Sequence, residues 1–585
     1  MCIEIIDAMK SHPPVLLFLR FFLLPLFLVS TARAGDTTMA QKIDGWLEPI
    51  AKAADSAVFY SLKVGGQSLP IILLILGGTA IFLTIYFKFI NITSVGLAVR
   101  TARGKYTDPD APGQITHFQA LTAALSATVG LGNIAGVAVA IGMGGPGATF
   151  WMVLMGLCGM TTKFCECTLG VKYRKIDENG KVSGGAMYYL SRGLKDKGLG
   201  GVGAVLATFF AVMCIGGALG AGNMFQVNQA TDQVVSSFGV FDGEGEKIWF
   251  GVILAVAVGL VIIGGIVVIA RVTSFLVPFM CGIYLIVALI IIATNLDQVG
   301  SALQMIIQGA FTPMAVGGGI VGVLIQGIKR AAFSNEAGVG SAPIAHSAVK
   351  TRKPASEGLV ALLEPFTDTV IVCTMTALVL VITGVWKVDA VVEKDEISLY
   401  KTKAMVEIVG SVTQGDELRI ISKEKKDEDK KLGERGQVWI KDLDNGEMET
   451  AWINYEGLVK IEGVTKTSRA FGQKFKSFPK ILAIAVLLFA FSTMISWSYY
   501  GEQAVIYLCG GHKPVVVLAY KIIFCCVVVV GAVSSLGNVV MLSDAMIFAM
   551  CFPNVLGLYF LAGEVKGDLS DYLKRVKSGE IKRFD

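Results

Sequence analysis

The sequence predicts an all-α protein that crosses a membrane many times and carries one small β domain inserted late in the chain. Two observations indicate the membrane part. The chain is 54% hydrophobic and only 17% charged, and its mean hydropathy is +0.64. Long apolar runs recur with charged segments between them, which is typical of a polytopic membrane protein. Residues 386–476 break this pattern, because they are charged and alternate in the manner of strands.

A spanning helix needs about 20 mostly apolar residues. With this length as the measure, we expect about eleven spans in the chain. They lie near residues 66–90, 118–142, 147–171, 203–232, 248–270, 273–293, 315–345, 357–384, 480–507, 514–535 and 540–562.

Residues 1–34 are expected to form a signal peptide. Basic residues precede the apolar run 21–29, and Ala32-Arg33-Ala34 matches a small-residue cleavage pattern. An uncleaved anchor helix is the alternative. In either case the segment 35–65 is expected to face away from the cytoplasm, and a cleavable signal suits a bacterial inner-membrane protein.

Basic residues in the short loops predict the orientation of the spans. The loops 91–117 and 172–202 and the tail 566–585 are rich in Lys and Arg, which places them in the cytoplasm. The transmembrane domain then has two parts, 35–384 and 477–565, and the insertion 386–476 is periplasmic. The net charge of +5 is explained by this membrane orientation, so we expect the lipid bilayer as a partner and no nucleic acid.

The insertion contains expected strands at 404–409, 417–421, 438–441 and 450–454. Asp444-Asn445-Gly446 is a strong hairpin signal between the last two. The segments GQVW at 436–439 and ETAWI at 449–453 resemble a bacterial SH3-type domain over roughly residues 400–462. The sequence therefore predicts a small SH3-like β-barrel, which is a possible docking site for a periplasmic partner.

The second expected span is interrupted by residues that suit an internal binding site. Thr128, Gly130, Gly132 and Asn133 stand within the apolar stretch 120–137. Backbone groups in hydrocarbon must be satisfied, so such a helix opens only where it lines a protein cavity. Close helix packing through small residues is the alternative. The Asn amide favours a site, since it offers a carbonyl for a cation and donors for a carboxylate.

Three long motifs resemble the alanine or glycine:cation symporter family. They are SATVGLGNIAG at 126–136, GGPGATFW at 144–151 and FSNEAGVGSAPIAH at 333–346. The resemblance covers residues 60–384 and 477–565. It implies an inverted-repeat core of the LeuT type, in which the first and sixth core helices are discontinuous. These would be the second and seventh spans here, and Gly317-Gly318-Gly319 suits the second break.

The resemblance implies a sodium site and a substrate site beside the first break. We expect amides near Gly130 and Gly132 to receive the substrate carboxylate, with Thr128 and Asn133 beside them. The expected sodium ligands are carbonyls near Ser126 and Val129 together with the hydroxyls of Ser492 and Thr493. The alternative for these two hydroxyls is ordinary bonding to the preceding helical turn.

The remaining expected substrate contacts come from three spans. The resemblance makes Gly222 and Gln226 substrate contacts, and Trp497 would close the pocket and limit the size of the side chain. Ile320 and Leu324, four residues apart, are expected to line an apolar pocket. Without the resemblance, a close-packing glycine face and a packing tryptophan would explain these residues equally well.

Glu336 follows the seventh span at a depth where a carboxylate is costly unless paired or functional. We expect a structural or gating ion pair with Arg330 or Lys329, and proton coupling is the alternative. No role is expected for Glu364, Asp368, Asp544, Glu166 or Lys163, which are taken as residues of helix ends or interhelical pairs.

The sequence thus predicts a symporter that couples sodium influx to uptake of a small neutral amino acid, alanine or glycine, by alternating access. A proton-coupled variant is one alternative. The other is an amino-acid-binding membrane sensor whose periplasmic domain recruits a partner. An enzyme is not expected, because the chain lacks the H-E-x-x-H and phosphate-loop motifs. We expect no cofactor other than the co-transported sodium ion.

Overall fold

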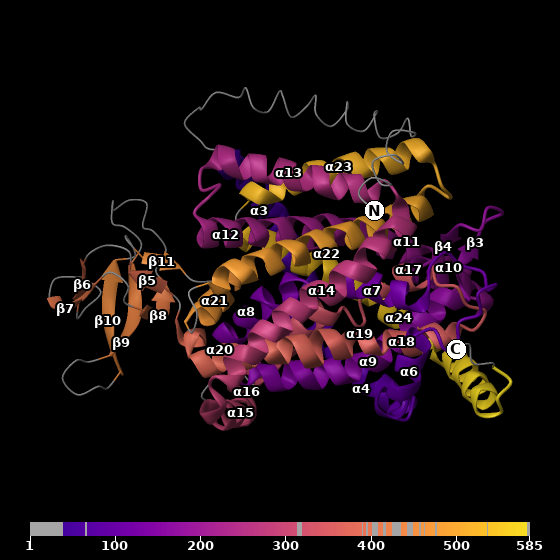
Figure 1. Ribbon diagram of the computed structural model, residues 1–585, viewed down its shortest axis with the longest axis horizontal. Coiled ribbons are helices and arrows are strands. Elements are labelled where there is room, and N and C mark those ends of the chain that lie inside the picture. Colours follow the sequence, from indigo (N-terminus) through magenta and orange to yellow (C-terminus); the bar gives the residue numbers. More distant parts are fainter. Residues whose placement is uncertain are drawn as a thin grey trace.

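The computed structural model describes residues 39–581, except for gaps within the loops and the insertion. The gaps are at 65–66, 313–318, 389, 393–395, 401–407, 414–416, 424–434, 442–447, 455–457, 461–462, 474–476 and 535. The expected signal peptide lies outside the described residues. The helices form one large bundle, with a β-sheet standing at one side of it (Figure 1).

Most of the expected spans are long helices. They are α9 (Ala148–Lys172), α11 (Gly200–Leu219) continued by α12 (Phe225–Phe238), α13 (Glu244–Ile262), α14 (Gly265–Ala293), α20 (Thr374–Thr383) with the turns before it, α22 (Phe478–Leu508), α23 (Pro514–Val533) and α24 (Leu536–Lys577). Within the described ranges, eight helices are long and apolar enough to cross a membrane. The pair α7 (His117–Thr128) and α8 (Ala135–Gly144) makes a ninth span if counted as one.

The two other expected spans coincide with shorter helices. These are α4 (Ile71–Tyr86) and α16 (Gly319–Asn335), with 16 and 17 residues. Every expected span therefore has a helical counterpart, while the number of membrane crossings and the inverted-repeat order stay predictions. The last helix continues to Lys577, so much of the expected tail is helical.

Two helices change geometry at internal turns. Between α11 and α12 the segment Gly220–Met224 is a π-helix, and Phe366–Cys373 before α20 is another. Such π segments occur frequently at functional sites. The second follows α18 (Pro354–Ala361) and α19 (Leu363–Pro365).

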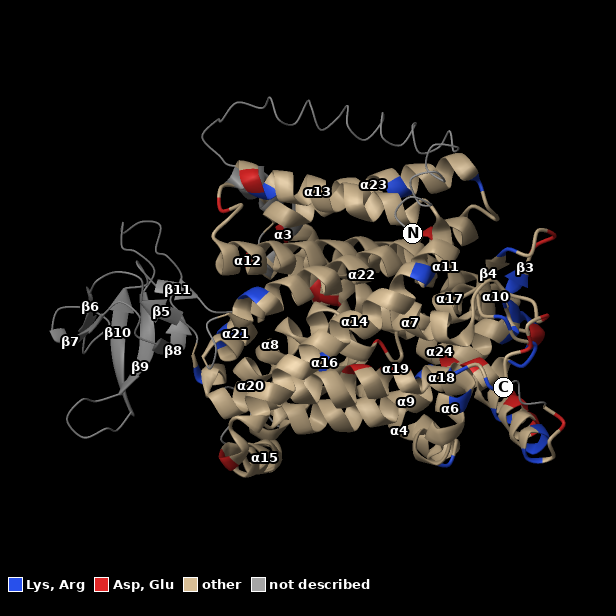
Figure 2. Cartoon of the chain, viewed as in Figure 1, with Lys and Arg blue, Asp and Glu red and all other residues tan. Residues whose placement is uncertain are grey.

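Shorter elements connect the long helices. They are α3 (Met39–Val58), α5 (Ile90–Thr93), α6 (Val95–Ala102), α10 (Ala186–Asp196), α15 (Leu296–Phe311), α17 (Ala342–His346), the turn Val385–Lys387 and α21 (Gly463–Gly472), together with the hairpins β1 (Ser61–Val64) with β2 (Gln67–Pro70) and β3 (Lys175–Ile176) with β4 (Val182–Ser183). Charged residues gather along the chain at the end of the bundle that carries β3, β4 and the end of α24 (Figure 2).

The insertion forms one antiparallel sheet of seven strands. They are β5 (Ala390–Val392), β6 (Glu396–Tyr400), β7 (Ile408–Thr413), β8 (Glu417–Lys423), β9 (Arg435–Lys441), β10 (Met448–Asn454) and β11 (Leu458–Lys460), in the order β11-β5-β8-β9-β10-β6-β7. β9 and β10 pair across the expected hairpin signal, with Lys441 opposite Met448. The turn itself lies outside the described residues, and the SH3-like identity of the domain stays a prediction.

Candidate functional site

The break between α7 and α8 lies where the sequence predicts it. α7 begins with a capping box in which Thr116 and Gln119 satisfy each other's backbone N–H groups. It ends at Thr128, a 3₁₀ turn follows at Leu131–Asn133, and α8 leaves at a bend of 57°. A side chain at Gly130 would lie 2.7 Å from Thr493 Oγ1, so glycine is what allows the opened backbone to approach its neighbour this closely.

The expected sodium ligands lie together at the end of α7. Ser126 Oγ donates to the carbonyl of Ser492 at 2.6 Å, and Thr493 Oγ1 donates to the carbonyl of Ser126 at 2.9 Å. Ser492 Oγ bonds the preceding turn of its own helix, at Phe489 O, as the structural alternative anticipates. Val129 follows directly and is fully buried. The break therefore meets α22 through a group of hydroxyl and carbonyl oxygens, the ligand type that hard cations prefer.

The expected substrate residues Gly130, Gln226 and Trp497 surround the same point. The Gln226 side chain donates to Ala221 O at 3.0 Å through Nε2. Its Oε1 lies 3.4 Å from the Cβ position of Gly130 and, among the described residues, has no hydrogen-bond partner although it is buried. This oxygen is therefore available to a ligand that carries a donor.

Trp497 is packed on the glycine floor of the π segment. A Cβ atom at Gly222 would lie 2.3 Å from Trp497 Cβ, and one at Gly217 would lie 3.4 Å from its Cζ3. The indole Nε1 donates to Ala127 O at 3.3 Å, a carbonyl freed by the end of α7. The structure thus brings Trp497 and Gly222 together beside the break.

Other expected substrate residues are placed differently. Ile320 and Leu324 lie in the first two turns of α16, and Ile320 is 41% exposed. They precede Phe333 by nine residues or more, about 13 Å along a helix, so the structure does not bring them beside Phe333, and the apolar pocket expected of them stays a prediction. The apolar neighbours of the break are Phe333, whose ring lies 3.5 Å from the Cβ position of Gly132, and Phe225, packed edge-on against it. Thr128 bonds carbonyls of its own helix.

A buried carboxylate that sequence analysis left without a role stands at the centre of the site. Asn133 Nδ2 donates to Asp368 Oδ1 and to Ser334 Oγ, and Asn133 Oδ1 accepts the N–H of Gly130. Ser334 and Thr369 donate their hydroxyls to Asp368 Oδ2 at 2.6 and 2.7 Å. Asp368 belongs to the π segment Phe366–Cys373 and is fully buried.

Asp368 has no basic partner in the part of the chain that the structure describes. The buried ion pairs of these helices use Glu364, Asp544 and Glu502 instead. A buried ionised carboxylate is costly unless a charge or a metal compensates it. The sequence does show that Asp368 is a carboxylate within an apolar segment, and this could have marked it as a candidate functional residue. Nothing in the sequence indicated that Asp368 contacts Asn133.

The structure describes a turn at the other end of α16 from the expected second break. α16 ends at Asn335, and residues 336–341 turn through Glu336, Gly338 and Gly340 at positive φ before α17 begins. Gly319 begins α16, and residues 313–318 lie outside the described residues, so the expected break at Gly317-Gly318-Gly319 stays a prediction. The N–H of Gly338 is accepted by Glu166 Oε1, which satisfies one of the freed groups.

The expected ion pair of Glu336 with Arg330 or Lys329 is not formed. Both basic side chains contact Asp544 Oδ2, at 3.5 Å from Arg330 Nη2 and 2.8 Å from Lys329 Nζ. Glu336 accepts a hydrogen bond from Ser341 Oγ instead. The Arg330 guanidinium points toward α24, whereas the Glu336 carboxylate points toward the loop that follows it. The prediction was wrong because it was based on the short distance between the two residues in the sequence.

Comparison with known proteins agrees with this geometry. The sequence model of the sodium:alanine symporter family matches residues 57–416 and 449–585, and the interval left out falls within the β insertion. A sodium/alanine symporter of Methanococcus maripaludis is 36% identical over 88% of this chain and 96% of its own. A putative sodium/proton-dependent alanine carrier of Bacillus subtilis is 29% identical over 90% of this chain and 94% of its own. The protein is thus a membrane transporter, not an enzyme, and belongs to the sodium:alanine symporter family.

Proposed function

We propose that this protein couples inward movement of sodium to uptake of a small neutral amino acid, alanine or glycine, by alternating access. The observation that carries the proposal is the broken helix α7/α8. At this break the oxygen atoms of Ser126 and Thr493 meet, and Gly130 faces the free Gln226 Oε1. A cation and a zwitterion can therefore bind side by side and stabilise one occluded state together.

The substrate is held at the glycine turn and under the indole. Opened backbone amides near Gly130 and Gly132, other than the Gly130 N–H that Asn133 Oδ1 accepts, receive its carboxylate, in the way that interrupted membrane helices bind anionic groups. Gln226 Oε1 accepts from its ammonium group. We assign Trp497 and Phe333 as the walls that limit the substrate side chain to a methyl group or a hydrogen atom, because Trp497 packs on Gly222 and the Phe333 ring lies 3.5 Å from the Cβ position of Gly132.

Two positions serve the coupling ion. The first comprises the oxygens of Ser126, Val129, Ser492 and Thr493. The second is Asp368, whose charge needs compensation and whose partners Asn133 and Ser334 come from the two broken helices. A cation at Asp368 would join these helices, so its binding would favour the occluded state.

A proton at Asp368 is the second candidate for the coupling ion. The carboxylate has no basic partner among the described residues, so protonation would remove its uncompensated charge without a metal. The Bacillus subtilis relative is named as a sodium/proton-dependent carrier. An inward pH gradient alone should drive alanine uptake if the proton is the coupling ion. It should not drive uptake if sodium is the coupling ion.

The surrounding topology follows from the charge pattern of the sequence. We place the transporter in the cell inner membrane, with the N-terminus and the insertion 386–476 in the periplasm and the C-terminus in the cytoplasm. The β domain then offers a surface to a periplasmic partner. We also propose that signal peptidase removes residues 1–34.

The test is uptake of labelled alanine by purified protein in liposomes. An inward sodium gradient should drive accumulation, while potassium replacement should abolish it, and an inward proton gradient without sodium should not replace it. Uptake that ignores sodium would overturn the sodium coupling. Binding of alanine without any flux would instead indicate a sensor.

A matched pair of variants on α22 locates the sodium site. Thr493→Val removes the hydroxyl beside Ser126 O and should raise the sodium concentration for half-maximal uptake about tenfold, equal to about 1.4 kcal/mol. Ser498→Ala is the control, because this buried hydroxyl bonds only Ile495 O in its own helix. Equal sodium dependence in the two variants would contradict the assignment.

A further inference from the structure

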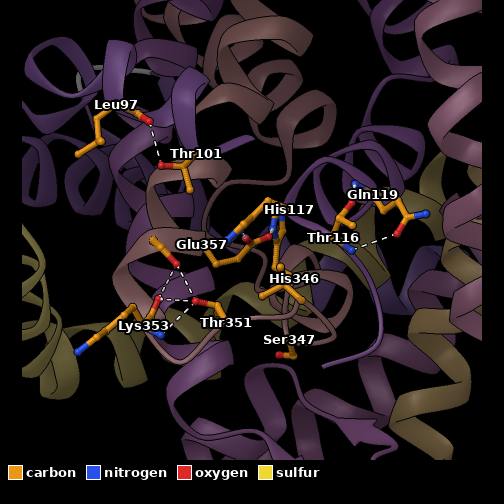
Figure 3. A network of polar contacts seen from close by, with 12 residues as sticks. Leu97, Thr101, Thr116, His117, Gln119, His346, Ser347, Thr351, Lys353 and Glu357 are labelled. Atoms are coloured by element: carbon orange, nitrogen blue, oxygen red, sulfur yellow. Dashed lines mark hydrogen bonds and ion pairs between the residues drawn. The ribbon is translucent and has the colours of Figure 1, made fainter. Parts of the chain in front are cut away.

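Five buried ionisable side chains form a line on the side of the bundle where α7 begins and α17 ends. His117 Nδ1 and His346 Nδ1 contact the two oxygens of the Glu357 carboxylate, one each (Figure 3). His346 Nε2 lies 3.5 Å from Glu364 Oε2. Glu364 Oε1 in turn is 2.9 Å from Lys163 Nζ. All five side chains are at most 1% exposed.

This line of side chains connects the start of α7 with the end of α17. These two segments lie next to the two breaks described above. His117 is the first residue of α7, and His346 is the last residue of α17. The carboxylate that both histidines share belongs to α18, which packs against α9. Glu357 is therefore the common attachment point of the two segments that must separate if the bundle opens toward this side.

Backbone contacts between the same segments surround the line. The N–H of Gln114 is accepted by Ala348 O, and the N–H of Lys350 by Ile115 O, both at 2.8 Å. The Arg174 guanidinium donates to four backbone carbonyls from both segments. These carbonyls belong to Pro112, Ser347, Val349 and Thr351. We call residues 112–117 and 346–351, with Arg174 and Glu357, the inner latch.

The charges of the line do not balance without a proton on a histidine. Two carboxylates, Glu357 and Glu364, face one permanent cation, Lys163. With both imidazoles neutral, one buried negative charge lacks a partner, and an unpaired buried charge is strongly unfavourable. One protonated imidazole makes the line neutral, and His346 is the member that lies between both carboxylates.

The neighbouring groups add negative charge near Lys163 and one cation at the edge. Glu166 and Glu336 are buried close enough to interact with Lys163. The cation facing Glu357 from the loop after α9 is Arg174. Further ionisable groups on packed elements include Cys165 and Cys167 on α9, Tyr500 on α22, Arg100 on α6, which is exposed, and Glu564 and Asp568 on α24, which pair with Lys172. Arg174 donates its guanidinium N–H groups to the four latch carbonyls and forms no ion pair with Glu357 among the described residues. The position between Glu357 and Glu364 is therefore occupied by His346 and not by a permanent cation.

We propose that His346, held between Glu357 and Glu364, is a proton-binding site that keeps the inner latch closed. The proton comes from water on the latch side and forms an N–H bond at Nε2, facing Glu364 Oε2, and the same bond breaks when the latch opens. No other bond changes. The functional meaning of the latch rests on the proposed alternating access, since the latch would control release of the substrate on its side.

The direction of the pH effect follows from proton linkage. The closed latch binds one proton more than the open latch, so lower pH favours the closed form and rising pH favours opening. A single linked proton changes the opening equilibrium by at most about tenfold per pH unit. The effect is therefore measurable across two pH units.

Hydrogen exchange of the purified full-length protein tests the proposal without using transport. The rates of peptides covering 112–120 and 342–351 are followed between pH 6 and pH 9 and corrected for intrinsic exchange. In the wild type, protection of both peptides should fall as pH rises, by up to about tenfold per unit. Protection that does not change with pH in the wild type would overturn the proposal.

Three variants separate the proton from mere packing. Glu357→Gln keeps the hydrogen bonds but makes the line neutral without an extra proton, so the pH dependence should disappear. His117→Gln leaves His346 between its carboxylates and should retain the pH dependence. Glu178→Gln changes an exposed carboxylate and is the matched control. If Glu357→Gln lowers protection equally at every pH and keeps the slope, the residue is structural only and the proposal fails.

A transport measurement in liposomes separates failure of the latch from failure of the proposed function. Efflux of preloaded labelled alanine is measured with the pH varied only on the latch side. Faster release at high pH in the wild type, but not in Glu357→Gln, supports the latch. No alanine movement at any pH would refute the transport proposal while the exchange result still stands. Release that is independent of pH, with normal uptake, would refute the latch alone.

Discussion

The contact between Gly222 and Trp497 makes a quantitative prediction about the substrate site. Carbon atoms in ordinary contact are about 3.5–4.0 Å apart, whereas a Cβ at Gly222 would lie 2.3 Å from both Cβ and Cγ of Trp497. The Cβ atom is fixed by the Trp497 backbone, so no rotation of the side chain relieves this contact. In Gly222→Ala the indole or the π segment must therefore move by more than about 1 Å.

Two losses contribute to the effect of this substitution. Overpacking of a buried site costs about 1–3 kcal/mol. Displacement of the indole also breaks its hydrogen bond to Ala127 O, already long at 3.3 Å, which contributes about 0.5–1.5 kcal/mol. A total of about 1.5–4.5 kcal/mol is expected, so the dissociation constant for alanine should rise at least about tenfold.

Gly217→Ala is the matched control, because Gly217 faces the far edge of the same indole. Its Cβ would lie 3.4 Å from Trp497 Cζ3 and from Met550 Sδ, which requires only small adjustments. Replacing a helical glycine by alanine also favours the helix by up to about 1 kcal/mol. Alanine binding and the melting temperature should therefore stay near the wild-type values.

Equilibrium binding of labelled alanine to the detergent-purified variants, together with thermal unfolding, measures both quantities. The reasoning is refuted if Gly222→Ala binds alanine as tightly as the wild type. It is equally refuted if Gly217→Ala is as damaging, since the effect would then not depend on the distance to Trp497.

Three further outcomes are expected. Asp368→Asn removes the uncompensated buried charge. Alanine binding should then lose most of its dependence on the coupling ion, while the protein still folds. An unchanged ion dependence in binding assays would exclude Asp368 as the second ion position. Asn133→Ala leaves the Gly130 N–H without its acceptor, and thermal unfolding should show a loss of about 1–3 kcal/mol, which would be absent if the amide contact were unimportant. Gly113 has a φ of +145°, and a Cβ atom there would lie 2.2 Å from Val349 O. In Gly113→Ala the hydrogen-exchange protection of residues 346–351 should therefore fall at every pH. Protection equal to that of the wild type would argue against this close contact between Gly113 and Val349.

Sequence analysis located the first break because the signal there is local. Small and polar residues within an apolar run are unfavourable in an uninterrupted membrane helix, so Gly130, Gly132 and Asn133 mark the position by themselves. The strands β8 to β10 were also predictable, since alternation and a turn motif are features of neighbouring residues. The same approach expects a second break at the triple glycine, which lies largely outside the described residues, and it did not anticipate the turn that follows Asn335.

The pairing of charges could not be predicted in the same way. Glu336 was assigned to Arg330 from their proximity in the sequence, whereas the structure pairs Arg330 with Asp544 on a distant helix. Asp368 received no role, because a carboxylate in an apolar run looks alike whether it lies at a helix end or between two breaks. Only the fold brings it to Asn133, which is 235 positions away in the sequence.

The sequence by itself determined that this chain is a polytopic membrane protein, that its second span opens at a glycine–asparagine turn, and to which family it is similar. These properties depend on composition and on residues close together in the chain. The tertiary structure alone decided which atoms face the opened backbone and which buried charges meet, including the shared carboxylate of His117 and His346. Contacts between distant helices set those partners, because long-range packing directs each side chain in a way that local periodicity does not specify.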